Sequence, residues 1–229
     1  MRGSNNTYKK QFMEVLIMEL KNKRVVFLGD SITEGWGTTG EEKVFHQILK
    51  RKYDLSLASN CGIGGTRIAR RKTPTLDATR FDLFFRLRAQ VMPKDVDMVV
   101  IFGGTNDFGH GDALFGDANS NDDYTFNGAL NNLINQVKED CPNACIVFLT
   151  PLHRFDEDYC VNGTGYILND YSNEIIKAAK RHNIYLIDLF NELYIDPLDK
   201  ELVTDGLHLS DKGHEIFAEF LSDKLEQLL

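Results

Sequence analysis

The sequence predicts an α/β fold in which five parallel strands form a sheet with helices on both faces. Five short runs rich in Val, Ile, Leu and Phe are typical of buried strands. Segments with helical spacing of apolar residues separate these runs, and a crossover between parallel strands requires such a connecting element. The 229 residues, 42% of them hydrophobic, fit one domain better than two half-sized ones.

Strands and helices are expected to alternate along the chain. The predicted strands cover residues 24–28, 55–59, 97–102, 145–149 and 184–187. The predicted helices cover residues 44–52, 81–91, 124–140, 165–181 and 210–228, and Ser210 is suited to cap the last of them. Two long polar loops, residues 107–123 and 152–164, follow the third and fourth strands at their carboxyl ends, where open α/β sheets bind ligands.

Residues 1–22 are expected to form an N-terminal extension to a single domain of residues 23–229. The opening MRGS is similar to a vector-derived leader, and a short helix is predicted over residues 8–20. The apolar run at residues 15–18 is too short for a signal-peptide core, and runs such as MVVIF fall far below the ~20 residues that a membrane helix needs. A cytoplasmic protein without a membrane span is therefore expected.

Charge and cysteine content narrow the classes of partner. The formal net charge of −8 leaves no basic stripe for phosphates, so nucleic acid is not an expected partner. The four cysteines would suffice for two disulfides or a tetrahedral metal site, but no C-x-x-C pair is present, which favours free thiols in a reducing compartment. No metal or cofactor is expected, while a homo-oligomer stays open.

The stretch VVFLGDSITEGWG, which spans the first predicted strand and the turn after it, admits two interpretations. The segment GWGTTG matches the G-x-G-x-x-G pattern of dinucleotide sites, but that pattern must turn directly from strand into helix, and DSITE intervenes. Ser31 in GDSIT could cap the following helix or serve as a nucleophile. The second role requires a base and an acid that orients it.

A suitable base and acid occur in DGLH, just before the last helix. Asp205 and His208 lie three residues apart, so in a tight turn the carboxylate can reach one imidazole nitrogen while the other faces a serine. A capping or surface histidine is the alternative for His208. His46, His182 and His214 fall within helical patterns and are interpreted as surface or packing residues.

Two further segments follow predicted strands. NCGIGGTR (residues 60–67) contains glycines that allow a backbone N–H to approach a ligand, and GGTND (residues 103–107) offers the amide of Asn106. Either segment alone could be an ordinary turn. An amide and backbone N–H groups directed at one point are, however, what a developing oxyanion requires.

Taken together, these segments resemble the GDSL-type esterases, also called SGNH hydrolases. GDSIT, NCGIGG, GGTND and DGLHLSDKGH match the family's four blocks in order, between residues 29 and 214. The resemblance implies a flavodoxin-like three-layer α/β/α sandwich around a five-stranded parallel sheet. It also implies Ser31 as nucleophile, His208 as general base and acid, Asp205 as its orienter, and an oxyanion hole from the N–H groups of Ser31 and Gly65 and the side chain of Asn106.

The sequence departs from the family pattern only in reading GDSI where the family name has GDSL, which is a packing change. The G-x-S-x-G elbow of ordinary α/β-hydrolases is absent, since Thr33 occupies its last glycine position. As the oxyanion-hole donor, Gly65 is chosen over Gly64 only because Asn60 aligns with the leading Asn of the family's second block.

The expected reaction is hydrolysis of an ester through an acyl-enzyme, with short acetyl-type esters, such as those on sugars, as the expected substrates. Loop residues that could contact the substrate mix aromatic and polar types, which suits a small acyl group on a polar alcohol; they are Trp36, Phe108, His110, His153 and Arg154. Lysophospholipase, thioesterase and acyltransferase activities stay open, because the acyl-enzyme is common to all of them. A binding module with a degenerate site is disfavoured by the complete set of residues.

Overall fold

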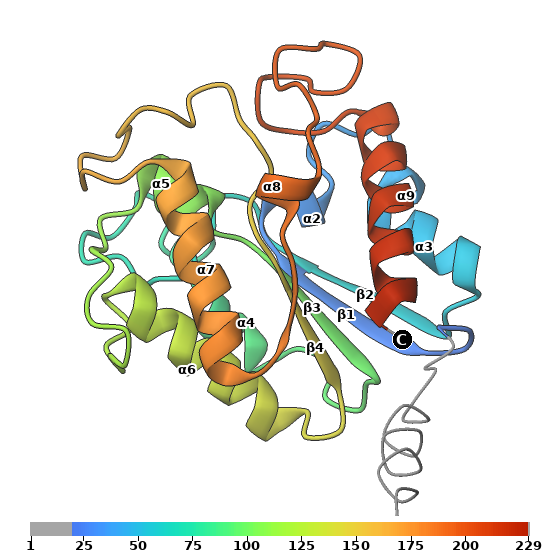
Figure 1. The fold of residues 1–229 in the computed structure, drawn as a ribbon, viewed down its shortest axis with the longest axis horizontal. Coiled ribbons are helices and arrows are strands. Elements are labelled where there is room, and N and C mark those ends of the chain that lie inside the picture. Colours follow the sequence, from blue (N-terminus) through green and yellow to red (C-terminus); the bar gives the residue numbers. More distant parts are fainter. Residues whose placement is uncertain (1–19, 229) are drawn as a thin grey trace, which may run out of the picture.

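The computed structural model describes residues 20–228 of the chain (Figure 1). The helix expected over residues 8–20 lies, up to its last residue, outside this range. Leu20, where the described part begins, is buried in the hydrophobic core.

Five parallel strands form one sheet, as predicted. They are β1 (Arg24–Gly29), β2 (Leu57–Gly62), β3 (Met98–Phe102), β4 (Cys145–Leu149) and β5 (Tyr185–Ile187), in the order β2-β1-β3-β4-β5. The first strand, β1, thus lies inside the sheet, with β2 added on one side of it and β3, β4 and β5 on the other. Since all strands are parallel, their carboxyl ends meet at one edge, where β1 ends between β2 and β3 (Figure 1).

Helices cover both faces of the sheet and make three layers (Figure 1). On one face α3 (Phe45–Tyr53) packs against α9 (Asp211–Leu228), and on the other α6 (Phe126–Asp140) packs against α4 (Phe85–Ala89) and α7 (Leu168–His182). Successive side chains of a strand point to opposite faces, so β1 contributes to two separate cores. Val25 and Phe27 join the core under α3 and α9, while Val26 and Leu28 join the other.

Short elements occupy the carboxyl edge of the sheet. Immediately after β1 comes α2 (Ser31–Glu34), and η1 (Glu41–Lys43) precedes α3. Residues 105–110, of which 107–110 were expected in a long loop, form the helix α5 (Thr105–His110) after β3, and α8 (Leu189–Glu192) follows β5. The loop prediction for residues 107–123 is therefore wrong at its start.

Two predicted elements are displaced or shortened. Strand β2 begins two residues later than expected because Asp54, with φ of 51°, ends α3, and Leu55 and Ser56 form the connection. Of the helix predicted over residues 81–91 only α4 forms, since Phe84 has extended backbone angles. Residues 81–84 instead form a turn, in which the Phe81 ring packs against Gly65 after β2.

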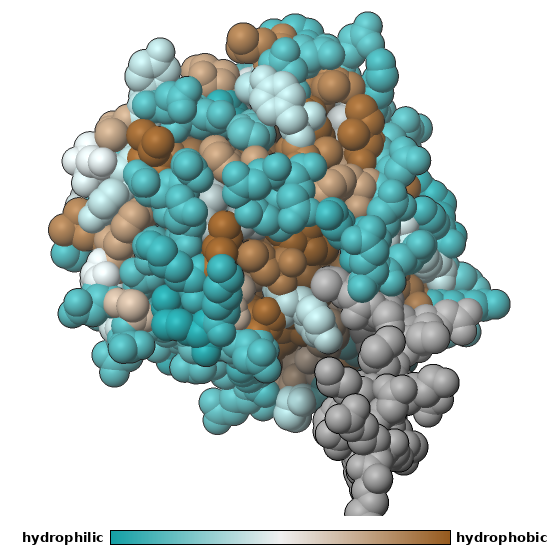
Figure 2. Space-filling view, in the orientation of Figure 1, coloured by the Kyte–Doolittle hydropathy of each residue, from teal (hydrophilic) through white to brown (hydrophobic). Residues whose placement is uncertain are grey.

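The surface in the view of Figure 2 is largely hydrophilic, with hydrophobic side chains interspersed among polar ones. A mixed surface of this kind is usual for a folded protein, because there is not enough polar surface to cover it completely. Within residues 20–228, no helix has both the length and the apolar character needed to cross a bilayer.

Two of the histidines interpreted as surface or packing residues, His46 and His214, are fully buried between α3 and α9. His46 Nε2 lies 3.1 Å from the carbonyl oxygen of Thr33, and His214 Nδ1 accepts the N–H of Phe45 at 3.3 Å. Burial lowers the pKa of His46 to about 4 and that of His214 to about 3. Both imidazoles are therefore neutral packing groups at neutral pH.

The neutrality of His214 predicts a measurable pH dependence of stability. Above pH 6.5 the His214 imidazole is neutral in both the folded and the unfolded chain. Between pH 6.5 and about 3 the unfolded chain binds a proton that the folded protein does not, so the free energy of unfolding decreases as the pH is lowered through this range. We expect His214→Gln, which keeps an acceptor for Phe45, to take up about one proton fewer than the wild type on unfolding between pH 4 and 6, so its free energy of unfolding should depend less steeply on pH. Urea titrations at several pH values measure this free energy. An equally steep pH dependence in the variant and the wild type would contradict the prediction.

Candidate active site

Ser31, His208 and Asp205 form a continuous hydrogen-bonded array at the carboxyl end of β1. Ser31 begins α2, and its Oγ lies 2.8 Å from Nε2 of His208. Nδ1 of His208 lies 2.7 Å from Oδ2 of Asp205. The three residues predicted to act together are thus brought together, across a sequence separation of 177 residues between serine and histidine.

The loop carrying Asp205 and His208 is fixed by its own backbone. An isolated antiparallel bridge joins Val203 to Leu209 and closes the loop at its base. Oδ1 of Asp205 accepts the N–H groups of Leu207 at 3.1 Å and His208 at 2.8 Å. Burial alone would raise the pKa of Asp205, but these bonds and its contact with the His208 ring outweigh that effect and lower the pKa. The carboxylate is therefore charged at neutral pH and faces the imidazole.

Two buried ionisable residues, Asp30 and Arg88, hold the backbone on either side of Ser31 in place. Asp30 caps α2 by accepting the N–H of Ile32 at 3.1 Å. NH1 of Arg88 donates to the carbonyl oxygens of Gly29, at the end of β1, and Cys61, in β2, each at 2.7 Å. Burial raises the pKa of Asp30 to about 6, against the opposing effects of the Ile32 N–H and the Arg88 charge.

Asn106 lies in the first turn of α5, with its side-chain amide hydrogen-bonded at both ends. Nδ2 donates to the carbonyl oxygen of Thr66 at 3.0 Å, and Oδ1 lies 3.2 Å from Nε2 of His110. The neighbouring Asp107 accepts the N–H groups of Ile68 and Ala69 at 2.9 and 2.8 Å, and these bonds hold the segment that follows the glycine-containing residues 60–67 against α5. Burial raises the pKa of Asp107 to about 7, against those two bonds.

Gly64 and Gly65, in the glycine-containing segment after β2, differ in the hydrogen bonding of their backbone N–H groups. The N–H of Gly64 donates to Oε2 of Glu34 at 2.6 Å and is therefore occupied. Gly65 has φ of +75°, which favours glycine, and a Cβ there would lie 2.7 Å from the ring of Phe81. Within residues 20–228 no hydrogen-bond acceptor is assigned to its N–H. Of the two glycines, Gly65 is the one whose N–H is free for a ligand.

Of the predicted substrate contacts, Trp36 lies beside the array, whereas Phe108 does not reach the surface. The Trp36 ring is 45% exposed, and its centroid lies 5.5 Å from that of His208. Phe108 is fully buried beside Tyr171 of α7, because α5 turns that side chain into the core. The prediction that Phe108 contacts substrate is wrong.

The other predicted contacts are engaged with protein groups. His110 is an exposed residue, but both ring nitrogens have partners, Asn106 and Arg67. Arg154 donates to Asp156 at 2.5 Å and to the carbonyl oxygen of Thr105 at 3.1 Å. His153 faces Glu157 at 2.9 Å. Direct contact of His110, His153 or Arg154 with a substrate stays a prediction.

Several residues around the glycine block were not singled out from the sequence. Glu34 holds Gly64 and pairs with Arg80 at 2.6 Å, while Phe81 covers Gly65 and Arg67 reaches His110. Phe81 was assigned to a predicted helix that begins only at Phe85. Arg67, by contrast, had a usable signal, because a charged residue directly after a glycine block at the ligand-binding edge is a candidate for site geometry.

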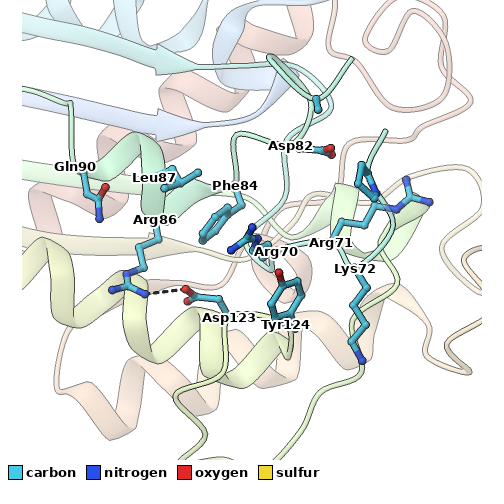
Figure 3. A pocket seen from close by; sticks show the side chains of 12 residues that line it. Arg70, Arg71, Lys72, Asp82, Phe84, Arg86, Leu87, Gln90, Asp123 and Tyr124 are labelled. Atoms are coloured by element: carbon cyan, nitrogen blue, oxygen red, sulfur yellow. Dashed lines mark hydrogen bonds and ion pairs between the residues drawn. The ribbon is translucent and has the colours of Figure 1, made fainter. Parts of the chain in front are cut away.

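A pocket of about 550 Å³ lies beyond the turn of residues 81–84 (Figure 3). Phe84, Arg86 and Leu87 line it together with Arg70 and Tyr124, and the guanidinium carbon of Arg70 lies 5.0 Å from the centroid of the Tyr124 ring. Arg86 is paired with Asp123 at 2.7 Å. None of Ser31, Asn106, Asp205 or His208 lines this pocket, so it is separate from the hydrogen-bonded array.

A five-stranded parallel sheet with a hydrogen-bonded Ser, His and Asp array at its carboxyl edge has the architecture of a serine hydrolase. Comparison with known proteins identifies the family: residues 27–216 match the model of the GDSL-like lipase/acylhydrolase family, so the chain belongs to it. Its members and structural relatives include esterases, and the protein is a carboxylic ester hydrolase.

Three relatives illustrate the similarity. A GDSL esterase/lipase of Arabidopsis thaliana is 24% identical over 234 residues, covering 91% of this chain and 88% of the relative. The crystal structure of a protein from Lactobacillus plantarum is 28% identical with a TM-score of 0.77, covering 91% of this chain and 99% of that one. An acetyl xylan esterase is 25% identical with a TM-score of 0.62, covering 88% and 98%. These likenesses confirm the predicted fold and family.

Proposed function

We propose that the protein hydrolyses carboxylic esters through an acyl-enzyme formed on Ser31. His208 takes the proton of the Ser31 hydroxyl as Oγ attacks the ester carbonyl, and returns it to the leaving alcohol as the ester bond breaks. A water molecule, deprotonated by the same imidazole, then attacks the acyl-enzyme and releases the acid. Asp205 holds Nδ1–H of His208 and stabilises the imidazolium that forms in each step.

The observation that carries this proposal is the unbroken chain of hydrogen bonds from Ser31 through His208 to Asp205, at 2.8 and 2.7 Å. A serine hydroxyl is a weak nucleophile unless a neighbouring base accepts its proton. If Ser31 served only as a helix cap, it would not need His208 and Asp205 as partners. The cap of α2 is in any case Asp30. Ser31 is therefore better explained as a nucleophile than as a cap.

Three donors are proposed to stabilise the oxyanion. Ser31 is the first residue of α2, where N–H groups have no partner within the helix. Gly65 contributes a second free N–H, and Asn106 contributes the Nδ2 hydrogen that is not donated to Thr66. Because such donors are fixed before the reaction, they stabilise the charge that develops in the transition state without reorganisation.

Short acetyl-type esters, such as acetylated sugars, are the proposed substrates. The structurally similar acetyl xylan esterase supports this class. The exposed Trp36 beside His208 offers an aromatic face of the kind that packs against a sugar ring, while Arg80 and Glu34 nearby supply polar groups. A polar rim with one aromatic platform suits a sugar alcohol better than a long acyl chain.

A series of p-nitrophenyl esters tests the acyl preference. We expect kcat/KM to be highest for the acetyl ester and to fall as the chain lengthens from acetate to butyrate and octanoate, because the mixed aromatic and polar residues beside Ser31 and His208 suit a small acyl group. Acetylated xylo-oligosaccharides, with released acetate as the readout, test the alcohol side. A kcat/KM that rises with chain length would instead favour a lysophospholipase or thioesterase activity.

Acyl transfer to a sugar hydroxyl is the second candidate, because the acyl-enzyme can be attacked by an alcohol as well as by water. Trp36 is exposed beside His208, so its ring face would be accessible to a sugar acceptor as well as to the leaving alcohol. Product analysis with an acetyl donor and sugar acceptors separates the two reactions. If the acetylated acceptor is the main product, acyl transfer and not hydrolysis is the activity of the protein.

A further inference from the structure

We propose that Arg67 and His110 are positioning residues that hold the Asn106 amide in the orientation needed for oxyanion binding. This inference rests on the proposed function, because it concerns how one of its three donors is aimed. Arg67 directly follows the glycine block, and His110 lies one helical turn after Asn106 on α5. Together with Asn106 they form a second hydrogen-bonded chain beside the first.

The distances give this chain a defined direction. NH1 of Arg67 lies 3.0 Å from Nδ1 of His110, and Nε2 of His110 lies 3.2 Å from Oδ1 of Asn106. A guanidinium can only donate, so Nδ1 of His110 must accept and Nε2 must carry the hydrogen. That hydrogen can only be donated to the oxygen of the Asn106 amide. The nitrogen of the amide is then left to donate to the Thr66 carbonyl at 3.0 Å.

Orientation matters because the two ends of an asparagine side chain have opposite character. If the amide were rotated by half a turn, Oδ1 would face the Thr66 carbonyl, and Nδ2 would face the N–H of His110. Both contacts would be repulsive. The chain thus keeps Nδ2, with its second hydrogen, in place, which matches the requirement that oxyanion donors be fixed before the reaction.

Both positioning residues are held in the state that the chain requires. Although His110 is exposed as a whole residue, desolvation of its ring, reinforced by the charges of Arg67, Arg71 and Arg154, lowers the pKa of His110 to about 4. The ring is therefore neutral at neutral pH and can accept from Arg67. Arg67 is only 2% exposed. Its NH2 donates to Asp82 at 2.9 Å and to the carbonyl oxygen of Phe81 at 3.1 Å, which anchors the guanidinium.

The test begins with His110→Ala, assayed for p-nitrophenyl acetate hydrolysis. We expect kcat to fall by roughly 10-fold with KM nearly unchanged, less than the 10²–10³-fold expected when a donor is removed. His110→Gln should recover most of the loss, because its amide can accept from Arg67 and donate to Asn106. His182→Ala is the matched control, since it removes a histidine that contacts the Oδ1 of Asn131 at 2.8 Å between α6 and α7.

A double-mutant cycle with Asn106→Ala decides between positioning and a general structural role. If His110 acts through Asn106, His110→Ala should have no further effect on kcat once Asn106 is alanine. Equal losses in both backgrounds, or wild-type kcat in His110→Ala, would overturn the inference. Failure of the proposed function would look different, because Ser31→Ala and Asn106→Ala would then leave ester hydrolysis intact.

Discussion

Ser31→Ala is expected to lower kcat for p-nitrophenyl acetate hydrolysis by roughly 10⁴- to 10⁶-fold. Without Oγ no acyl-enzyme can form, and the activity that remains comes from water attacking a substrate held beside the other groups. KM should change little, because the alanine removes only one atom from the binding surface. The decrease is measured by steady-state kinetics on purified protein, with the rate of spontaneous hydrolysis subtracted.

Ser172→Ala is a suitable control for this experiment. Ser172 is also buried, but its hydroxyl donates within α7 to the carbonyl oxygen of Leu168 at 3.3 Å. Loss of one buried hydroxyl there should leave kcat unchanged. Hydrolysis by Ser31→Ala within about tenfold of the wild-type rate, in protein that unfolds at the wild-type temperature, would contradict the assignment of the nucleophile.

Asn106→Ala is expected to lower kcat by roughly 10²- to 10³-fold, again with little change in KM. In the proposed mechanism the amide stabilises charge that exists only in the transition state, so its loss should affect the rate and not the binding of the neutral ester. The matched control is Asn127→Ala, in which a buried asparagine on α6 loses its bond to the carbonyl oxygen of Gly116. An equal loss of activity in both variants would point to damaged packing in place of a missing donor.

The sequence predicts the architecture well because strands and helices have different apolar periodicities. All five strands and the helices α3, α6, α7 and α9 lie within a few residues of their expected places. The errors arise where long-range contacts override local preference. Residues 81–84, for example, have helical spacing, but Phe81 covers Gly65 and Asp82 pairs with the buried Arg67, which keeps the chain in a turn.

In the candidate site, too, some features follow from the local sequence and others only from long-range contacts. Ser31, Asn106, Asp205 and His208 stand in short segments at strand ends and before the last helix, and parallel strands bring such ends to one edge. Whether Gly64 or Gly65 has a free N–H depends on Glu34, whose role no local pattern indicates. Phe108 follows the same logic, because only the formation of α5 determines that its ring enters the core.

The most direct test of the central claim is the detection of an acyl-enzyme on Ser31. The protein is mixed with p-nitrophenyl acetate, quenched in acid within the first turnover, digested and analysed by peptide mass spectrometry. The proposed mechanism predicts one acetyl group on Ser31, within the peptide that contains GDSIT, and no acetylation of that peptide in His208→Ala. Rapid hydrolysis of the ester with Ser31 unmodified at every quench time, or with the acetyl group on another residue, would contradict it.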